Sequence, residues 1–231
     1  CAGDCSGDAV VDECDECGGN GVNSNEITSL AEDDTLFKWY KESLPIIITV
    51  GRLYPQKNHA CLIKAFSILS NKIESRLIII GEGPLRQSLE RLAKSVGVAE
   101  HTWFAGYQNN PYKFLAKSSL FVLSSRWEGF PNVLLEAMVC KVAVISTDID
   151  FGPKEMIDHG KTGFLVPDDD PETLASQIQY VLQKRSGEAI KGIINNARKK
   201  VETEFSLEVM VKKYKEYFLN VHSNSRYAKL H

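Results

Sequence analysis

Glu128 and Glu136, with seven residues between them, are the acids whose surroundings most clearly indicate chemistry. Glu128 is expected in a loop that Gly129 turns sharply, and a helix is predicted to begin near Asn132, a good N-cap. The N–H groups at the start of that helix would attract negative charge. Two carboxylates beside it need partners, and the hydroxyls of a sugar and a ribose would serve. The alternative is that both glutamates are ordinary surface acids.

A pair of cations occurs in the segment GRLYPQKN, residues 51–58. Gly51 would permit a close approach of the backbone to a ligand, and Arg52 and Lys57, five residues apart, can converge on one anion. We predict that these residues bind a diphosphate. The alternative is a solvated loop that carries two surface cations.

The elements that would position these residues are apolar runs that alternate with segments of helical periodicity. Continuous runs of valine, isoleucine and leucine predict strands buried on both faces. Leucines at helical spacing follow the first, second and fourth runs, and Gly97 is expected to end the second of these helices. From about Pro171 to Val221 the pattern is helical only. The six runs are Ile46–Val50, Leu77–Ile80, Thr102–Ala105, Leu120–Leu123, Val142–Ile145 and Gly163–Val166.

This alternation predicts an α/β fold with a Rossmann-like, doubly wound parallel sheet and C-terminal helices. Ligands of such sheets bind at the carboxyl ends of the strands. The two cations follow the first run and Glu128 follows the fourth, so we expect them at the same edge. The glycines of GEGP (81–84) after the second run could bind a phosphate at the start of a helix, but the segment lacks the GxGxxG pattern, and we favour a tight turn there. Asp148 and Asp150 have the spacing of a metal-binding pair, but we do not expect them to bind a metal.

The charge of the chain is unevenly distributed. Residues 1–37 contain ten of the 30 acidic residues and none of the 27 basic ones. The net charge of −3 is therefore the sum of −10 from this head (residues 1–37) and +7 from the remainder, which has 20 acidic and 27 basic residues. A basic remainder favours a polyanionic ligand or an anionic lipid surface, although net charge alone is a weak indicator. No apolar run reaches about 18 residues, so we predict no membrane-spanning helix.

Several motifs occur together and in a fixed order. Besides the two glutamates with Gly-Phe-Pro between them, the chain contains VGRLYPQKN (50–58), IIIGEGPLRQSLERLAKSVGV (78–98), FAGY (104–107) and GPKEMIDHGKTGFLVP (152–167). With these motifs, residues 45–220 resemble the retaining glycosyltransferases of the GT-B fold, family 4. The resemblance implies one half of a GT-B fold, the half that binds a nucleotide-sugar donor. It also implies an enzyme that transfers a hexosyl or N-acetylhexosaminyl group from a UDP-sugar to a glycan or lipid-linked acceptor.

The resemblance further implies a role for each matched residue. Glu128 would be the catalytic residue that faces the transferred sugar, and Glu136 would accept hydrogen bonds from the ribose hydroxyls. The donor diphosphate would be bound by Gly51, Arg52 and Lys57, the donor sugar and phosphate by Gly129, Phe130, Pro131, Asn132 and Val133, and the base would lie near Ala105, Gly106 and Tyr107. No cofactor, no metal and no nucleic-acid partner are expected. Because such donors are cytosolic, we expect a cytoplasmic protein with peripheral contact at the inner face of a membrane.

Two features depart from the family pattern. Lys141 replaces a usual glycine and Ala143 a usual proline, so the turn before the fifth strand must form without glycine. Residues 1–40 stand where the family has an acceptor domain, so we expect a donor-binding half that turns over poorly alone. Two alternatives stay open, namely a nucleotide-sugar binding module without catalysis and a fragment of a GT-B sugar-nucleotide epimerase.

The head contains four of the six cysteines, Cys1, Cys5, Cys14 and Cys17. Four interpretations are open: a disulfide framework, a small zinc site, a calcium-binding segment that weakly resembles Cys/Asp-rich thrombospondin type 3 repeats, and a disordered acidic tail. We divide the chain into a Cys-rich acidic segment (1–22), a linker (23–40), the donor-binding domain (41–221) and a tail (222–231). Cys61 and Cys140 are expected to be small buried hydrophobic residues.

Overall fold

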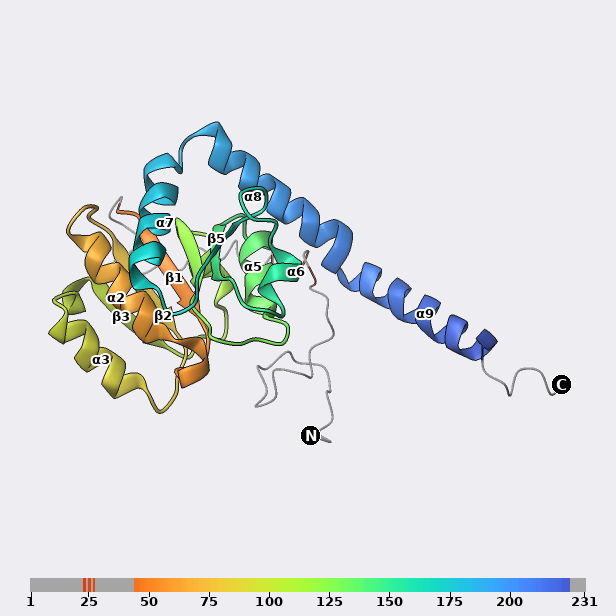
Figure 1. Cartoon of the computed structure of the whole chain (residues 1–231), viewed down its shortest axis with the longest axis horizontal. Helices are drawn as coiled ribbons and strands as arrows, with labels where there is room; N and C mark the ends of the chain where they lie inside the picture. Colours follow the sequence, from red (N-terminus) through yellow and green to blue (C-terminus); the bar gives the residue numbers. More distant parts are fainter. Residues whose placement is uncertain (1–22, 24, 26, 28–43, 225–231) are drawn as a thin grey trace.

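The computed structural model describes residues 23, 25, 27 and 44–224. The Cys-rich segment with Cys1, Cys5, Cys14 and Cys17 lies outside the described residues, as does most of the predicted linker. Within that linker, Ile27 is buried among the apolar side chains of the domain. The described part is an α/β domain from which a long C-terminal helix projects (Figure 1).

Six strands form one parallel sheet in the order β3-β2-β1-β4-β5-β6. The chain builds outward from β1 on one side and then returns to the other side of β1 at β4, which is the order of a doubly wound nucleotide-binding fold. The predicted fold class is confirmed, and every predicted strand lies within two residues of an observed one. The strands are β1 (Ile46–Val50), β2 (Arg76–Ile80), β3 (Thr102–Gly106), β4 (Leu120–Leu123), β5 (Ala143–Thr147) and β6 (Phe164–Val166).

Helices cover both faces of the sheet (Figure 1). Successive side chains of a strand point to opposite faces, and in β1 Ile47 packs on one face while Ile46 and Ile48 pack on the other. The first face is covered by α2 (His59–Ser70), α3 (Arg86–Ser95) and α7 (Pro171–Lys184), and the second by α4 (Tyr112–Leu115) and α5 (Asn132–Val139). Helix α8 (Glu188–Lys200) contributes to both, with Ile190 in the cluster of the first face and Ala197 in that of the second. Shorter elements are η2 (Pro55–Lys57), η3 (Ala99–His101), α6 (Pro153–Met156) and the π-helical turn η4 (Val201–Phe205).

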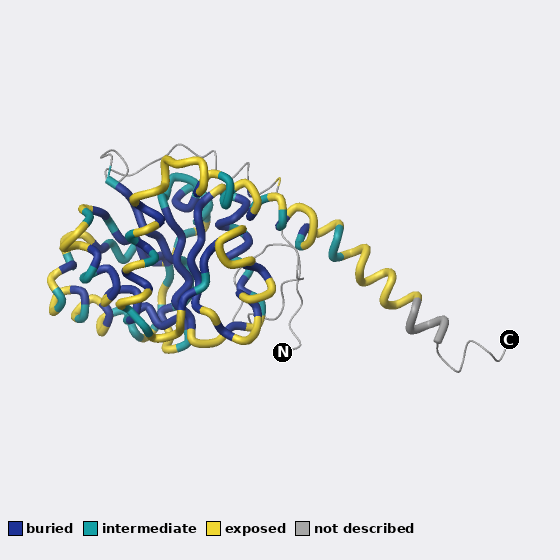
Figure 2. Tube along the Cα trace, turned by 45° about the horizontal axis from the view of Figure 1, so that its top comes forward, coloured by how far each residue is buried: buried dark blue, intermediate teal, exposed yellow. Residues whose placement is uncertain are grey.

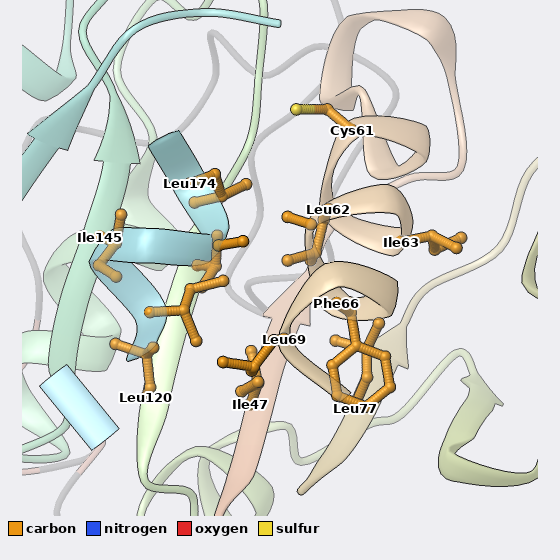
Figure 3. Packing of buried hydrophobic residues seen from close by; sticks show 14 of the residues in the cluster. Ile47, Cys61, Leu62, Ile63, Phe66, Leu69, Leu77, Leu120, Ile145 and Leu174 are labelled. Atoms are coloured by element: carbon orange, nitrogen blue, oxygen red, sulfur yellow. The ribbon is translucent and has the colours of Figure 1, made fainter. Parts of the chain in front are cut away.

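Packing on the first face fixes the central strands relative to one another (Figure 3). Side chains of β1, β2, β4 and β5 lie beneath α2 and α7, and nearly all of them are excluded from water. Burial of each large apolar side chain stabilises the fold by about 1.5–3 kcal/mol. The loops that follow β1 and β4 therefore start from a rigid base. The residues labelled in the figure are Ile47, Cys61, Leu62, Ile63, Phe66, Leu69, Leu77, Leu120, Ile145 and Leu174.

Two helices, α3 and α5, end with the same pair of backbone hydrogen bonds. In each, the residue after the C-cap donates its N–H to the carbonyl of the second-last helical residue, Lys94 or Met138. The next residue, Val98 or Val142, donates its N–H to the carbonyl one residue earlier in the helix. This is the Schellman motif, which requires a left-handed residue. Gly97 takes that place after α3 with φ +80°, as predicted, and Lys141 takes it after α5 with φ +58°. The turn before β5 thus forms without glycine.

The last helix, α9 (Leu207–Asn224), leaves the body of the domain and is mostly exposed (Figure 2). It extends beyond Val221, the predicted end of the domain. Its exposed large apolar side chains are Leu207, Val211, Tyr214, Tyr217, Phe218 and Leu219. Within the described residues, neither α9 nor any other helix has the length and apolar character needed to cross a membrane.

Candidate functional site

The candidate site lies at the carboxyl ends of β1 and β4. These strands pair only through Ile47 with Leu120 and Ile48 with Phe121, although β1 continues to Val50. Sheets of this strand order bind ligands at this point, where the order reverses. The loops that follow the two strands, residues 51–58 and 124–131, are the segments that the sequence predicts to lie at one edge.

Hydrogen bonds join these two loops. The Ser124 hydroxyl donates to the carbonyls of Lys57 and Asn58 at 3.0 and 3.2 Å. The Arg126 N–H donates to the Gln56 carbonyl at 2.8 Å. Because Ser124 is buried, its two bonds are shielded from competing water. The two loops are therefore held as one unit.

A third loop, after β6, is tied to both of the others through Asp169. Its carboxylate accepts a hydrogen bond from Asn58 Nδ2 at 3.1 Å and pairs with Arg126 Nη2 at 3.2 Å. The bond from Asn58, with the charge of Arg126, lowers the pKa of Asp169. Since Asp169 is exposed, this contact adds little stability and mainly fixes the position of the loop.

At the centre of the site, Lys57 and Glu128 form a buried ion pair. Lys57 Nζ lies 2.9 Å from Glu128 Oε1 and 3.2 Å from Oε2, and the two side chains are 8% and 2% exposed. The Ser125 hydroxyl donates to Oε1 at 2.5 Å, and Gln56 Nε2 donates to Oε2 at 3.4 Å. Removing one partner of such a pair leaves an uncompensated charge, which costs about 3–5 kcal/mol. Lys57 and Glu128 are therefore mutually dependent.

The two predicted diphosphate-binding cations have different surroundings. Lys57 contacts Glu128, whereas the Arg52 guanidinium lies over the Tyr54 ring, 5.4 Å from its centroid. Gly51 lies against the stem of Lys57, because a Cβ there would be 3.4 Å from Lys57 Cε. Two protons of the Lys57 ammonium group suffice for Glu128, which leaves a third for another acceptor. That Arg52 and Lys57 converge on one anion stays a prediction.

The start of α5 differs from the prediction. Asn132 is the first residue of the helix, and Pro131 takes the N-cap position. The prediction that Asn132 caps the helix is wrong, because its side chain lies within the first turn instead of before it. Asn132 Oδ1 is buried and accepts no hydrogen bond from the described residues. Among the described residues no side chain caps α5, which leaves its first N–H groups available to an anion.

The glycine after Glu128 also has a different role from the predicted one. Gly129 is not left-handed, and a Cβ there would meet no atom within 4 Å, so the turn does not require glycine. The close approach occurs at Gly152, which has φ +79°. A Cβ on Gly152 would lie 2.7 Å from both the Gly129 carbonyl oxygen and Pro131 Cδ. The loop after β5 therefore lies against the start of α5, while Phe130 and Val133 pack on the core.

Glu136 lies one turn inside α5 and is half-buried. Its burial raises its pKa from the usual 4.5 to about 7. No described residue gives this carboxylate a hydrogen bond or an ion pair. A carboxylate that is costly to ionise and has no protein partner is typical of a ligand site. The ribose-binding role of Glu136 stays a prediction.

The predicted base-proximal loop is at the same edge, beyond β2. Ala105 and Gly106 end β3, and Tyr107 follows as an exposed ring. Gly106 has φ +69°, and a Cβ there would lie 2.8 Å from Glu82 Oε1. This contact places the loop against the turn after β2. That a base binds near these residues stays a prediction.

The turn after β2 is the tight turn that the sequence predicts. Gly81 has φ +136°, and a Cβ there would overlap the Gly51 carbonyl oxygen at 2.0 Å. The Leu53 N–H donates to the Glu82 carbonyl at 2.8 Å. Glycine at position 81 thus allows the loops after β1 and β2 to touch.

The aspartates with metal-binding spacing share a cation. Lys154 Nζ lies 3.5 Å from Asp148 Oδ1 and 3.7 Å from Asp150 Oδ1. Across the part of the chain that the structure describes, no cluster of three or more histidine, cysteine or acidic side chains could hold a metal ion. Both aspartates therefore share an exposed contact with Lys154.

Sequence reasoning missed two residues of the site, Ser125 and Gln56. Both donate to the Glu128 carboxylate. Gln56 directly precedes Lys57, and Ser125 is three residues before Glu128. Their proximity to predicted residues was a signal, but uncharged side chains in loops do not reveal their partners.

A family model described as "Glycosyl transferases group 1" matches residues 33–200, which include all the candidate site residues. The chain belongs to the glycosyl transferases group 1 family. A relative from Campylobacter jejuni, the N-acetylgalactosamine-N,N'-diacetylbacillosaminyl-diphospho-undecaprenol 4-alpha-N-acetylgalactosaminyltransferase, is 39% identical over 137 residues, or 59% of this chain and 37% of the relative. The N-acetyl-alpha-D-glucosaminyl L-malate synthase of Bacillus anthracis is 30% identical over 189 residues, or 82% of this chain and 49% of the relative. The chain thus spans less than half the length of either protein.

Solved structures have the same fold, and one of them is named a glycosyltransferase. One from Rickettsia africae has a TM-score of 0.77 and 24% identity, covering 89% of this chain and 56% of that one. Anabaena HepE, solved in complex with UDP, has a TM-score of 0.73 and 20% identity, covering 87% of this chain and 54% of that one. These likenesses confirm the predicted half of a GT-B-like fold.

Proposed function

We propose that this chain is the donor-binding half of a retaining glycosyltransferase of family 4 with a UDP-sugar as donor. The enzyme transfers a hexosyl or N-acetylhexosaminyl group to a glycan or lipid-linked acceptor. The observation that carries the proposal is the buried Lys57–Glu128 pair at the carboxyl ends of β1 and β4. The helix that follows Glu128, α5, supports the proposal with an N-terminus that its own N-cap side chain does not cap and with Glu136, whose carboxylate has no partner among the described residues.

The cationic groups of this edge suit the leaving group. When the bond between the sugar and the diphosphate breaks, its electron pair goes to UDP, and negative charge grows on the phosphate oxygens. Arg52, the third proton of Lys57 and the first N–H groups of α5 would stabilise that charge. In this proposal they do the work of a metal ion, and the reaction needs no cofactor.

The carboxylates suit the rest of the donor. Positive charge grows on the sugar ring as the bond breaks, and the fixed negative charge of Glu128 would stabilise it. Glu136 would accept hydrogen bonds from the ribose hydroxyls. The base would lie near Ala105, Gly106 and Tyr107. The donor class is supported by the structural neighbour HepE, which was solved with UDP. The lipid-linked acceptor is supported by the Campylobacter jejuni relative, an N-acetylgalactosaminyltransferase named for a diphospho-undecaprenol compound.

Such an acceptor would place the enzyme at the cytoplasmic face of a membrane. The +7 charge of residues 38–231 supports contact with anionic lipid, because each Lys or Arg near such a surface contributes about 1 kcal/mol.

Calorimetric titration of the chain with UDP, UDP-glucose, UDP-N-acetylglucosamine and UDP-N-acetylgalactosamine tests the donor. We expect saturable binding of UDP and of at least one UDP-sugar, and no binding at millimolar ligand would refute the proposal. Glu136→Ala should weaken UDP binding, whereas Glu128→Gln, which keeps the shape of the side chain and an acceptor for Lys57, should spare it and abolish transfer in the full-length enzyme. Equal loss of UDP affinity in the two variants would contradict this division of roles, and the exposed Glu188→Ala serves as the control.

Product analysis with the full-length enzyme separates the alternatives. Free UDP with a new glycoside identifies a transferase, and its anomeric configuration tests retention. An epimerised sugar nucleotide identifies an epimerase. Binding of a UDP-sugar without any product identifies a binding module.

A further inference from the structure

The carboxylate of Glu128 is fully occupied in the ligand-free protein. Oε1 accepts from Lys57 and Ser125, and Oε2 accepts from Lys57 and Gln56. An ionised carboxylate offers about four lone-pair sites, so these four contacts use all of them. A hydroxyl group of a bound sugar can therefore hydrogen-bond to Glu128 only by replacing one of the existing donors.

The four contacts differ in how easily they can be replaced. The bonds from Lys57 and Ser125 are 2.5–3.2 Å long and buried. The contact from Gln56 is the longest at 3.4 Å, and the Gln56 side chain is only half-buried. Gln56 Nε2 also has a shorter bond, 3.0 Å, to the Trp127 carbonyl. Oε2 is thus the oxygen that can exchange its partner, while Oε1 is fixed.

The fixed side of the carboxylate is anchored in the sheet. Ser125 is fully buried directly after β4, and its carbonyl accepts a short hydrogen bond from the Thr147 hydroxyl at the end of β5. The adjacent Ser124 ties the same stretch to the loop after β1. The Ser125 hydroxyl is consequently held in place by two strands, and it can orient Glu128 without moving itself.

We propose that Ser125 and Gln56 are positioning residues for Glu128 with opposite effects on the donor. Ser125 holds Oε1 so that Oε2 faces the ligand side, and Gln56 occupies Oε2 until a hydroxyl of the donor sugar takes its place. The released amide keeps its bond to the Trp127 carbonyl, so no polar group is left without a partner. This inference rests on the proposed function of Glu128.

Titration calorimetry of the chain with UDP and with the UDP-sugar that binds most tightly tests both residues. Ser125→Ala should weaken UDP-sugar binding about tenfold, since a hydrogen bond to a charged group is lost, and leave UDP binding within about twofold. Gln56→Met, which removes the amide at similar volume, should tighten UDP-sugar binding about two- to fivefold and leave UDP binding unchanged. Ser146→Ala is the control, because Ser146 is equally buried on β5 and its hydroxyl donates to the Thr147 carbonyl.

The outcomes separate this inference from the proposed function. Absence of UDP binding to the unmodified chain overturns the proposed function and the inference with it. If UDP binds normally, a Ser125→Ala variant that binds the UDP-sugar like the parent, or that loses UDP affinity equally, overturns the inference alone. A Gln56→Met variant that weakens UDP-sugar binding would show that Gln56 is not a replaceable partner. Thermal unfolding of each variant, measured without ligand, identifies a general loss of structure, which would also count against a positioning role.

Discussion

Replacement of Glu136 by glutamine tests the electrostatics of the site without any knowledge of the sugar. Glutamine has nearly the same shape and no charge, and the carboxylate has no hydrogen-bond or ion-pair partner among the described residues to lose. Burial raises the pKa of Glu136 from 4.5 to about 7. The variant therefore removes a group whose cost to the fold depends on pH.

The sign of the effect follows from proton binding. Because the pKa of Glu136 is higher in the folded protein, the folded state holds its proton more tightly than the unfolded state does. Its contribution to stability is full below about pH 4.5 and is lost as the pH rises to about 7. Each unit of pKa difference is worth about 1.4 kcal/mol, and since the side chain is only half-buried we expect a total of roughly 1–3 kcal/mol. Glu136→Gln should thus gain stability over the parent chain from pH 5 to pH 8.

Urea unfolding of both proteins at pH 5 and pH 8 measures this gain. A difference between variant and parent that is the same at both pH values would refute the reasoning. UDP adds a second measurement, because a ribose hydroxyl would favour the ionised form of Glu136. UDP should therefore bind the parent chain more tightly at pH 8 than at pH 6. The terminal phosphate of UDP itself titrates near pH 6 and also changes the affinity with pH. The control is therefore Glu136→Gln, whose UDP affinity should change less between pH 6 and pH 8 because it has no carboxylate to ionise.

Three further predictions concern the other residues of the site and the helix that leads away from it. Lys57→Met should lower the unfolding free energy by about 3–5 kcal/mol by leaving Glu128 buried without its cation, and Lys57→Met/Glu128→Gln should recover most of it in urea unfolding. A double variant no more stable than Lys57→Met would contradict the pairing argument. Gly129→Ala should change the unfolding free energy by less than about 0.5 kcal/mol, because its Cβ would meet no atom, but it should weaken binding of a UDP-sugar in calorimetry. Gly152→Ala should unfold at a clearly lower temperature, because its Cβ would clash with Gly129 and Pro131. Lys141→Gly should raise the unfolding free energy by about 0.5–1 kcal/mol by relieving a left-handed side chain, with the exposed Lys161→Gly, which is not left-handed, as the control. Equal effects of the two lysine substitutions would refute it.

The sheet could be predicted from the sequence because its strands are buried on both faces. Such strands read as continuous apolar runs, and all six runs are strands. The helices α4 (Tyr112–Leu115) and α6 (Pro153–Met156) could not be found, because four residues are too few to show helical periodicity. The order of the strands was also beyond the pattern, since apolar runs do not record which strands are neighbours.

The residues of the site were predictable one by one, but their contacts were not. Lys57 and Glu128 were expected to bind different parts of a ligand, and in the structure they bind each other across 71 residues of chain. That contact depends on β4 lying next to β1, which is a property of the topology. The helix cap at Asn132 failed for a related reason. A cap is decided by where the backbone enters the helix, and a shift of one residue moves the side chain from the cap into the first turn.

The two Schellman motifs show that a helix can end in the same way with or without a glycine in the sequence. After α3 the glycine signal is present at Gly97, and it correctly predicted the end of the helix. After α5 the signal is absent, yet Lys141 adopts the same left-handed conformation and the same hydrogen bonds form. The cost of a side chain there is roughly 1–2 kcal/mol, which the two hydrogen bonds and the burial of Val142 and Ala143 can offset. A departure of this kind from a family pattern therefore affects the stability of the turn and leaves β5, and with it the anchor of Ser125, in place.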